Sequence, residues 1–154
     1  MSMRDLHSNI ALAQGIKAQT ITTAGGAKNT GDIDLQGFNS AVVVINFGSS
    51  GDTLAAGVKF DVKLEHADDN GSGAAGTYVA VAAKDVNFAA PEVTPDASGN
   101  MVLVDAPGED NAVYGLGYVG NKRYIRCTVT PSAGNTNGTP VSVTIIKGNP
   151  AIAG

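Results

Sequence analysis

Apolar and polar positions alternate along most of this chain, and the alternation predicts β-strands. Residues 58–66 show it most clearly, because Phe60, Val62 and Leu64 are separated by charged residues. A period of two puts apolar side chains on one face of a strand and charged side chains on the other. We therefore predict a strand here with one buried face and one solvated face.

The strongest apolar run, SAVVVINF at 40–47, has a different pattern. It is short, rich in β-branched residues and followed by glycine, which favours a central strand covered on both faces. The same reasoning predicts further short strands elsewhere in the chain. They lie at 19–23, 32–35, 77–81, 101–104 and 141–145, and we expect 77–81 to form a hairpin with 58–66.

A second alternating run covers residues 122–130. Its β-branched, aromatic and long polar side chains are typical of a strand. Two side chains of this strand, Tyr124 and Arg126, are candidates for contact with a neighbouring protein. The alternation places Ile125, Cys127 and Val129 on the inner face, and Tyr124, Arg126 and Thr128 on the outer face.

Loops rich in glycine, asparagine, aspartate and proline separate these strands, with no helical segment between them. About eight short strands in that arrangement predict an all-β, single-domain antiparallel β-sandwich, jelly-roll or Greek-key-like. We assign the sandwich to residues 18–147. Residues 1–17 show no strand alternation and no strong helical period, so we expect an extended N-terminal arm there. Residues 148–154 are expected to form a C-terminal tail of mostly small residues.

Composition narrows the possible functions. The 154 residues suffice for one domain with a substantial core, and the single cysteine, Cys127, cannot form an internal disulfide. The net charge is −4 and no basic stripe is present, so we expect no nucleic-acid partner. No apolar run approaches the ~20 residues of a membrane span, and no convincing signal peptide is present. We therefore expect no membrane partner and synthesis in the cytoplasm.

Gly115, Gly117 and Gly120 match the G-x-G-x-x-G motif of dinucleotide-binding proteins. That motif works where the glycines follow a strand and open a helix, whose N-terminus faces the pyrophosphate. Here the strand predicted at 122–130 follows instead of a helix. We therefore expect a glycine-marked turn that leads into this strand, and no bound cofactor.

Possible metal ligands are densest at 65–69, where the sequence is EHADD. A calcium loop that started at Asp68 would need glutamate at its twelfth position, where this chain has Val79. A hydrated hairpin loop is the simpler interpretation, because turns favour aspartate, asparagine and glycine for conformational reasons. We assign no metal ligand, and the sequence leaves open whether this loop binds a cation.

Catalytic constellations are also missing from the sequence. Asp32 and Asp34 share one face of a short strand, which is typical of a solvated face, and Cys127 on an inner face fits a small core residue. The two histidines, His7 and His66, offer neither a triad nor a multi-histidine metal site. We predict that the chain is not an enzyme and has no catalytic residues.

Five groups of residues carry a family resemblance. They are RDLHSNI at 4–10, GFNSA at 37–41, Phe60 with LEHADD at 64–69, GTY at 76–78, and Tyr114 with GYVGNKRYIR at 117–126. Together they resemble small structural proteins encoded among the head genes of tailed bacteriophages and prophages, and in particular the decoration, or cement, proteins of capsids. The resemblance spans most of the chain.

The resemblance implies a β-rich subunit on the exterior of an icosahedral capsid in the virion, made in the host cytoplasm. Such a subunit clamps neighbouring major capsid proteins, often as a trimer near a local three-fold axis. It brings no catalytic residue, metal or cofactor with it. We accordingly expect the major capsid protein as partner and a homo-oligomer, with a trimer favoured.

The expected N-terminal arm can make contact by adding a strand to the sheet of a neighbour. In that case Leu6 and Ile10 are apolar anchors. The polar contacts are then Arg4, Asp5 and His7. A frayed chain end is the alternative, because termini are poorly ordered unless they are docked.

Other functions stay open at this point. The chain could be a tail-tube, head-completion or tail-terminator protein of a phage. It could also be a β-sandwich that binds carbohydrate or another surface ligand. Carbohydrate platforms use exposed aromatic side chains, and the absence of tryptophan argues against that function.

Overall fold

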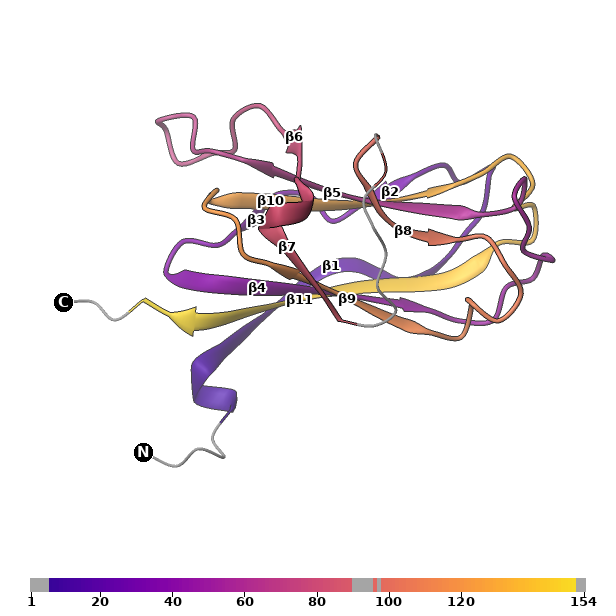
Figure 1. Ribbon diagram of the computed structural model, residues 1–154, viewed down its shortest axis with the longest axis horizontal. Coiled ribbons are helices and arrows are strands. Elements are labelled where there is room, and N and C mark those ends of the chain that lie inside the picture. Colours follow the sequence, from indigo (N-terminus) through magenta and orange to yellow (C-terminus); the bar gives the residue numbers. More distant parts are fainter. Residues whose placement is uncertain (1–5, 90–95, 97, 152–154) are drawn as a thin grey trace.

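Two antiparallel sheets pack face to face in the computed structural model, which describes residues 6–89, 96 and 98–151 (Figure 1). Sheet A contains, in spatial order, β1 (Ile10–Ile21), β11 (Thr139–Pro150), β4 (Phe38–Phe47), β9 (Val113–Tyr118) and β7 (Val86–Ala89). Sheet B contains β2 (Lys28–Asn29), β10 (Tyr124–Pro131), β5 (Phe60–Ala67) and β6 (Val79–Ala80), with β3 (Ile33–Asp34) paired to β10 and β8 (Asn100–Val104) paired to β5. Two short 3-10 helices, η1 (His7–Asn9) and η2 (Ala83–Asp85), complete the described elements.

The chain crosses repeatedly between the two sheets. After β4 in sheet A it enters β5 and β6 in sheet B, and then each next strand from β7 to β11 lies in the opposite sheet. Neighbours within a sheet are therefore far apart in sequence, as β1 and β11 are, which is characteristic of Greek-key sandwiches. The structure confirms the predicted single-domain β-sandwich and the predicted hairpin of β5 with β6.

The core lies between the sheets and is closed by larger side chains near both ends. Towards one end, the Phe47 ring of sheet A lies 5.6 Å from the Phe60 ring of sheet B and 5.9 Å from the Tyr114 ring. Towards the other end, the rings of His66 and Tyr118 meet edge to face at 5.8 Å across the sheets. Aliphatic side chains fill the space between, among them Val43, Ile45, Val62, Leu64, Leu116 and Ile125.

The expectation of a separate N-terminal arm over residues 1–17 is wrong for residues 10–17. These residues belong to β1, which pairs with β11 from Ile10 opposite Gly148 onward. The register shifts between Gln14 and Ile16 and again between Ile16 and Gln19. Such bulges break the period of two, which is why the sequence shows no alternation there. The C-terminal tail is likewise shorter than expected, because β11 continues to Pro150.

Two further expectations need correction in sheet A. The run at 40–47 is central in its sheet, but only its inner face is covered, and Val42 on the outer face is 38% exposed. Gly115 and Gly117 lie inside β9, opposite Val44 and Val42, so they do not form a turn. Only the third glycine of that motif lies in the loop before β10.

Replacing Phe47 by alanine should lower the free energy of unfolding by about 3–5 kcal/mol, because the side chain is fully buried between two other rings. The matched control is Val119→Ala, which shortens an apolar side chain that is half exposed. That control should change the free energy by less than about 0.5 kcal/mol. Urea unfolding measures both, and equal losses would contradict the assigned core.

Candidate functional site

One end of the sandwich brings together most of the segments that carry the family resemblance. The start of β4 lies there beside the ends of β11 and β9, since Ser40 pairs with Gly148 and Ala41 with Tyr118. The start of β10 lies beside the end of β5 in sheet B, since Tyr124 pairs with Ala67. We call this region, with the connections 35–37, 67–78 and 119–123, the motif end. The start of β1 and the end of β11 lie at the same end of the molecule (Figure 1).

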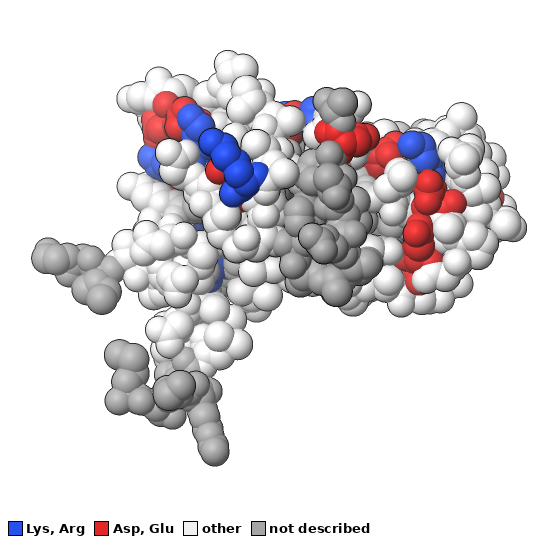
Figure 2. All heavy atoms as spheres, in the orientation of Figure 1, with Lys and Arg blue, Asp and Glu red and all other residues white. Residues whose placement is uncertain are grey.

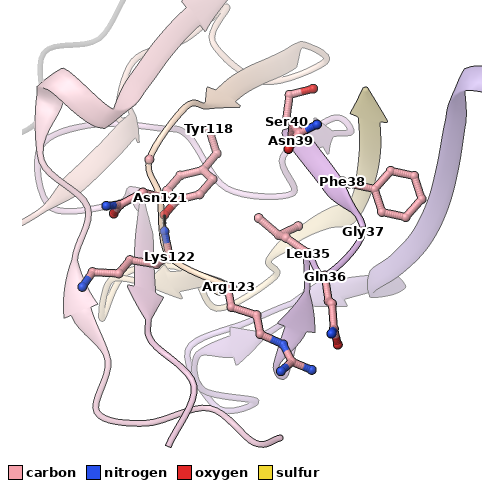
Figure 3. A pocket seen from close by; sticks show the side chains of 11 residues that line it. Leu35, Gln36, Gly37, Phe38, Asn39, Ser40, Tyr118, Asn121, Lys122 and Arg123 are labelled. Atoms are coloured by element: carbon pink, nitrogen blue, oxygen red, sulfur yellow. Dashed lines mark hydrogen bonds between the residues drawn. The ribbon is translucent and has the colours of Figure 1, made fainter. Parts of the chain in front are cut away.

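A hollow of about 330 Å³ opens at the motif end. One wall is the segment from Leu35 to Ser40, and the other is formed by Tyr118 and the residues from Gly120 to Arg123. Figure 3 shows these two segments facing each other across the hollow. Much of the lining consists of amide, hydroxyl and cationic side chains, so the hollow can offer hydrogen bonds to a partner.

A chain of hydrogen bonds connects this hollow to the core. Tyr118 is buried on the inner face of β9, and its hydroxyl lies 3.0 Å from Nδ1 of buried His66. The same hydroxyl oxygen accepts a hydrogen bond from the backbone N–H of Lys122 at 3.0 Å. We assign the hydroxyl proton to the bond with Nδ1, which makes His66 neutral and protonated on Nε2. Burial lowers the pKa of His66 and therefore favours this neutral form.

Ion pairs fix the loop that follows Tyr118. Arg123 donates from Nε and Nη2 to the two carboxylate oxygens of Asp34 at 3.0 and 2.8 Å, and it also pairs with Asp69. Lys122 pairs with Asp68. The bond from Arg123 lowers the pKa of Asp34. The expected hairpin loop at 65–69 begins later, because residues 65–67 belong to β5. Its two acidic residues, Asp68 and Asp69, neutralise cations of the chain itself, and Figure 2 shows blue and red atoms side by side over this end.

The third acidic residue of the 65–69 segment lies on β5 and binds Arg126 on β10. Glu65 accepts hydrogen bonds from Nε and Nη2 of Arg126 at 3.1 and 2.8 Å. The Arg126 guanidinium also lies 4.0 Å from the centre of the Tyr78 ring, a stacking that adds to the ion pair. The Tyr78 hydroxyl in turn donates to Asp32 at 2.8 Å. Burial is the main cause of the raised pKa of Tyr78.

The two predicted contact residues of β10, Tyr124 and Arg126, differ in how far they are exposed. Arg126 is partly exposed on the outer face of sheet B, as the alternation predicts. Tyr124 lies on the same face but is only 4% exposed, because the 67–76 loop covers it and its hydroxyl donates to the Gly73 carbonyl at 2.7 Å. The expectation that Tyr124 is open to a neighbouring protein is therefore wrong.

The predicted contact residues near the N-terminus also differ in exposure. Leu6 is 68% exposed and His7 is exposed, so both are accessible at the motif end. Ile10 is partly buried as the first residue of β1. Arg4 and Asp5 lie outside the described residues.

The remaining candidates for chemistry have structural roles. Cys127 is buried as expected, and burial raises the pKa of its thiol to about 12. Asp32 and Asp34 bind different partners, Tyr78 and Arg123. Within the described ranges, no group of three histidine, cysteine, aspartate or glutamate side chains is arranged to hold a metal ion.

Sequence reasoning missed Tyr118 and Tyr78, which organise the motif end. Tyr118 could have been found, because Tyr114, Leu116 and Tyr118 alternate with glycines as the inner face of a strand does. No sequence signal points from Tyr78 to Arg126, since the stacking joins a residue in the connection before β6 to a residue of β10 that is far away in the chain.

Comparison of the chain with family models, with curated proteins and with solved structures finds no match in any of the three. Among the residues that the structure describes, no helix is both long enough and apolar enough to cross a membrane.

Stability should fall as the pH drops below the ordinary His66 value of 6.5. The pKa of His66 is lowered in the folded state, so the unfolded chain binds the proton more readily between the two values. The contribution of neutral His66 to the free energy of unfolding is therefore fully present above pH 6.5. It decreases as the pH falls from 6.5 to the lower pKa of the folded state. Urea unfolding at a series of pH values measures this slope. His66→Gln should flatten the slope, and an unchanged slope in His66→Gln would falsify the assignment.

Arg123→Lys should lower the melting temperature at low salt, because lysine cannot reproduce the paired bonds to Asp34 and the third bond to Asp69. The loss should shrink at high salt, since these groups are partly exposed and screened. Lys84→Arg, at an exposed position of η2, is the matched control and should have almost no effect. Thermal unfolding at two salt concentrations tests both variants.

Proposed function

We propose that this chain is a virion structural protein that binds major capsid subunits on the exterior of the head and stabilises the shell, with the motif end as its contact surface. One observation carries the proposal. The segments on which the resemblance to phage decoration proteins rests are scattered from residue 6 to residue 126, yet most of their residues lie at this one end.

The exposed residues of those segments suit recognition better than folding. Asn39 and Asn121 are exposed, line the hollow and lie on its two opposite walls. Neither fills the core, and the Asn39 amide also donates to the Asn149 carbonyl at 3.1 Å, which fixes its position. Amide side chains of this kind donate and accept hydrogen bonds, so they can recognise the backbone of a neighbouring subunit.

The buried residues of the same segments hold that surface in one shape. The Tyr118 hydroxyl anchors the backbone of Lys122, and Arg123 ties the loop to Asp34 on β3. A Cβ atom at Gly120 would approach the Tyr118 hydroxyl to 2.6 Å, so the loop passes directly over the ring. A surface that is ordered before binding loses less conformational entropy when a partner docks, which favours a permanent clamp.

Charge at the motif end is largely balanced internally. Lys122, Arg123 and Arg126 each face a carboxylate of the chain itself. A partner that relied on one strong charge, such as nucleic acid, would have to compete with these pairs. Shape and neutral hydrogen bonds therefore dominate recognition here, which is compatible with the folded surface of a capsid subunit.

The protein should co-sediment with emptied, expanded capsids of the corresponding phage, saturably and at a fixed ratio to the major capsid protein. Asn121→Glu should weaken this binding by at least about tenfold, because a carboxylate without a partner is costly in a buried interface. Ala56→Glu adds the same charge at the opposite end, in the exposed connection between β4 and β5, and should bind as the unaltered chain does.

Two results would overturn the proposal. Absence of co-sedimentation under all conditions rejects decoration of the capsid. Equal losses in Asn121→Glu and Ala56→Glu, with both variants folded by circular dichroism, reject the motif end as the contact surface. Saturable binding that only Asn121→Glu weakens supports both parts.

A further inference from the structure

The outer face of sheet A differs sharply from the outer face of sheet B. On sheet B, the outward positions of β5 and β10 include Asp61, Lys63, Glu65 and Arg126. On sheet A, residues that pair directly across the strands share a face, so the rows can be taken from the register. The first row consists of Leu12, Ile146, Val42, Gly117 and Asn87. The second row consists of Gln14, Thr144, Val44 and Gly115, and the third of Ser142, Asn46 and Val113. No acidic or basic residue occurs in these rows, and the charged residue of β1, Lys17, is exposed in the bulge between Ile16 and Gln19, outside the rows.

Apolar side chains are also concentrated on that face. Among the described residues, six large hydrophobic side chains are exposed, and four of them, Leu12, Val42, Val113 and Val119, lie on β1, β4 and β9 or just after β9. Single exposed hydrophobic residues are ordinary, but a shared uncharged face is typical of an interaction surface. The outer face of sheet A is therefore a candidate interface.

The outer face of sheet A has a protruding side chain on one side and a hollow on the other, so two copies of the face can be complementary. At one side, Leu12 on the edge strand β1 is 69% exposed and protrudes. At the other side, Gly117 has no side chain, and a hollow of about 320 Å³ lies there against Val42 and Val119. The protrusion and the hollow belong to the same cross-strand row, three strands apart.

We propose that sheet A pairs face to face with sheet A of a second copy of this chain. A two-fold axis parallel to the strands, passing between β11 and β4, maps β1 onto β9 and β11 onto β4. Leu12 of each copy then lies over Gly117 of the other, and Ile146 of each lies over Val42 of the other. Contacts of this reciprocal kind define an isologous interface.

Charge favours a second copy as the occupant. The chain carries a net charge of −4, so two copies repel each other wherever their acidic surfaces meet. The outer rows of sheet A carry no charge and allow approach without like-charge contacts. Rows that hold only apolar and neutral polar side chains also have little with which to attract an oppositely charged partner.

The size of the face is sufficient for a weak, concentration-dependent dimer. Under this axis four strands of six to twelve residues overlap. Spacings of about 4.8 Å between strands and about 3.4 Å between residues give roughly 20 by 25 Å, or about 500 Å² per copy. Two such faces together bury about 1,000 Å², which is typical of a weak interface. The inference is independent of capsid binding, because it concerns sheet A and not the hollow of the motif end.

Light scattering after size exclusion, over a roughly hundredfold dilution series, tests the proposal by mass action. We expect a particle of twice the 15.5 kDa chain mass at high concentration. A monomer at every concentration overturns the proposal, and so does a trimer, which a two-fold interface cannot produce. Neither result bears on the capsid experiment, so the two proposals can fail separately.

Charged substitutions then locate the interface. Val42→Lys and Ile146→Glu should each weaken the dimer by at least about a hundredfold, because a charge is desolvated against apolar groups. Thr130→Lys, opposite Asp61 on the exposed face of sheet B, is the control and should leave the dimer intact. A dimer that survives Val42→Lys and Ile146→Glu overturns the assignment to sheet A.

A mixing experiment tests the two-fold axis itself. Under this axis Val42 of one copy faces Ile146 of the other. The two charged variants, each monomeric alone, should therefore form a heterodimer when mixed, through one lysine–glutamate contact. Mixing that gives only monomers overturns this axis.

Discussion

The packing of sheet A against sheet B constrains the rest of the molecule. Phe47 and Tyr114 reach from one sheet to Phe60 on the other, while His66 and Tyr118 meet across the sheets nearer the motif end. Stacked sheets lie about 10 Å apart, so short β-branched side chains fill the middle and larger groups close the layer near its ends. Once these inward positions are set, the period of two decides which residues each strand turns outward. The charged face of sheet B and the uncharged face of sheet A are both consequences of that choice.

The His66–Tyr118 contact also connects the core to the surface at the motif end. Tyr118 packs in the core through its ring, and its hydroxyl holds the backbone of Lys122. The adjacent Arg123 is then in place to bind Asp34 on β3. A disturbance of the inter-sheet packing at this end would therefore change the shape of the hollow, although no core residue needs to touch the partner. Under the proposed function, recognition of the partner and stability of the fold therefore depend on the same few groups.

The sequence predicts the strands whose alternation is complete and misses those whose alternation is interrupted. In β5 and β10 every second side chain is apolar, so the strands, their hairpin partner and the buried Cys127 could be predicted. In β1 the register shifts near Gly15 hide the pattern. Tyr124 shows a different limit, because alternation gives its face of the sheet but not the loop that covers it. The pairing of Arg123 with Asp34 joins positions 89 residues apart, and only the fold brings them together.

The glycines of β9 show how the surroundings decide what a motif means. Gly117 pairs with Val42 on one side and with Asn87 on the other, and a Cβ atom there would lie 3.0 Å from the Asn87 carbonyl oxygen. Glycine therefore permits the close approach of β7 at this position. The missing side chain also leaves the hollow beside Val42 on the outer face of sheet A. In a nucleotide-binding protein the same spacing brings backbone close to phosphate at the start of a helix. Here β9 continues through the first two glycines, so the backbone approaches a neighbouring strand instead, and the open surface above Gly117 can receive an apolar side chain.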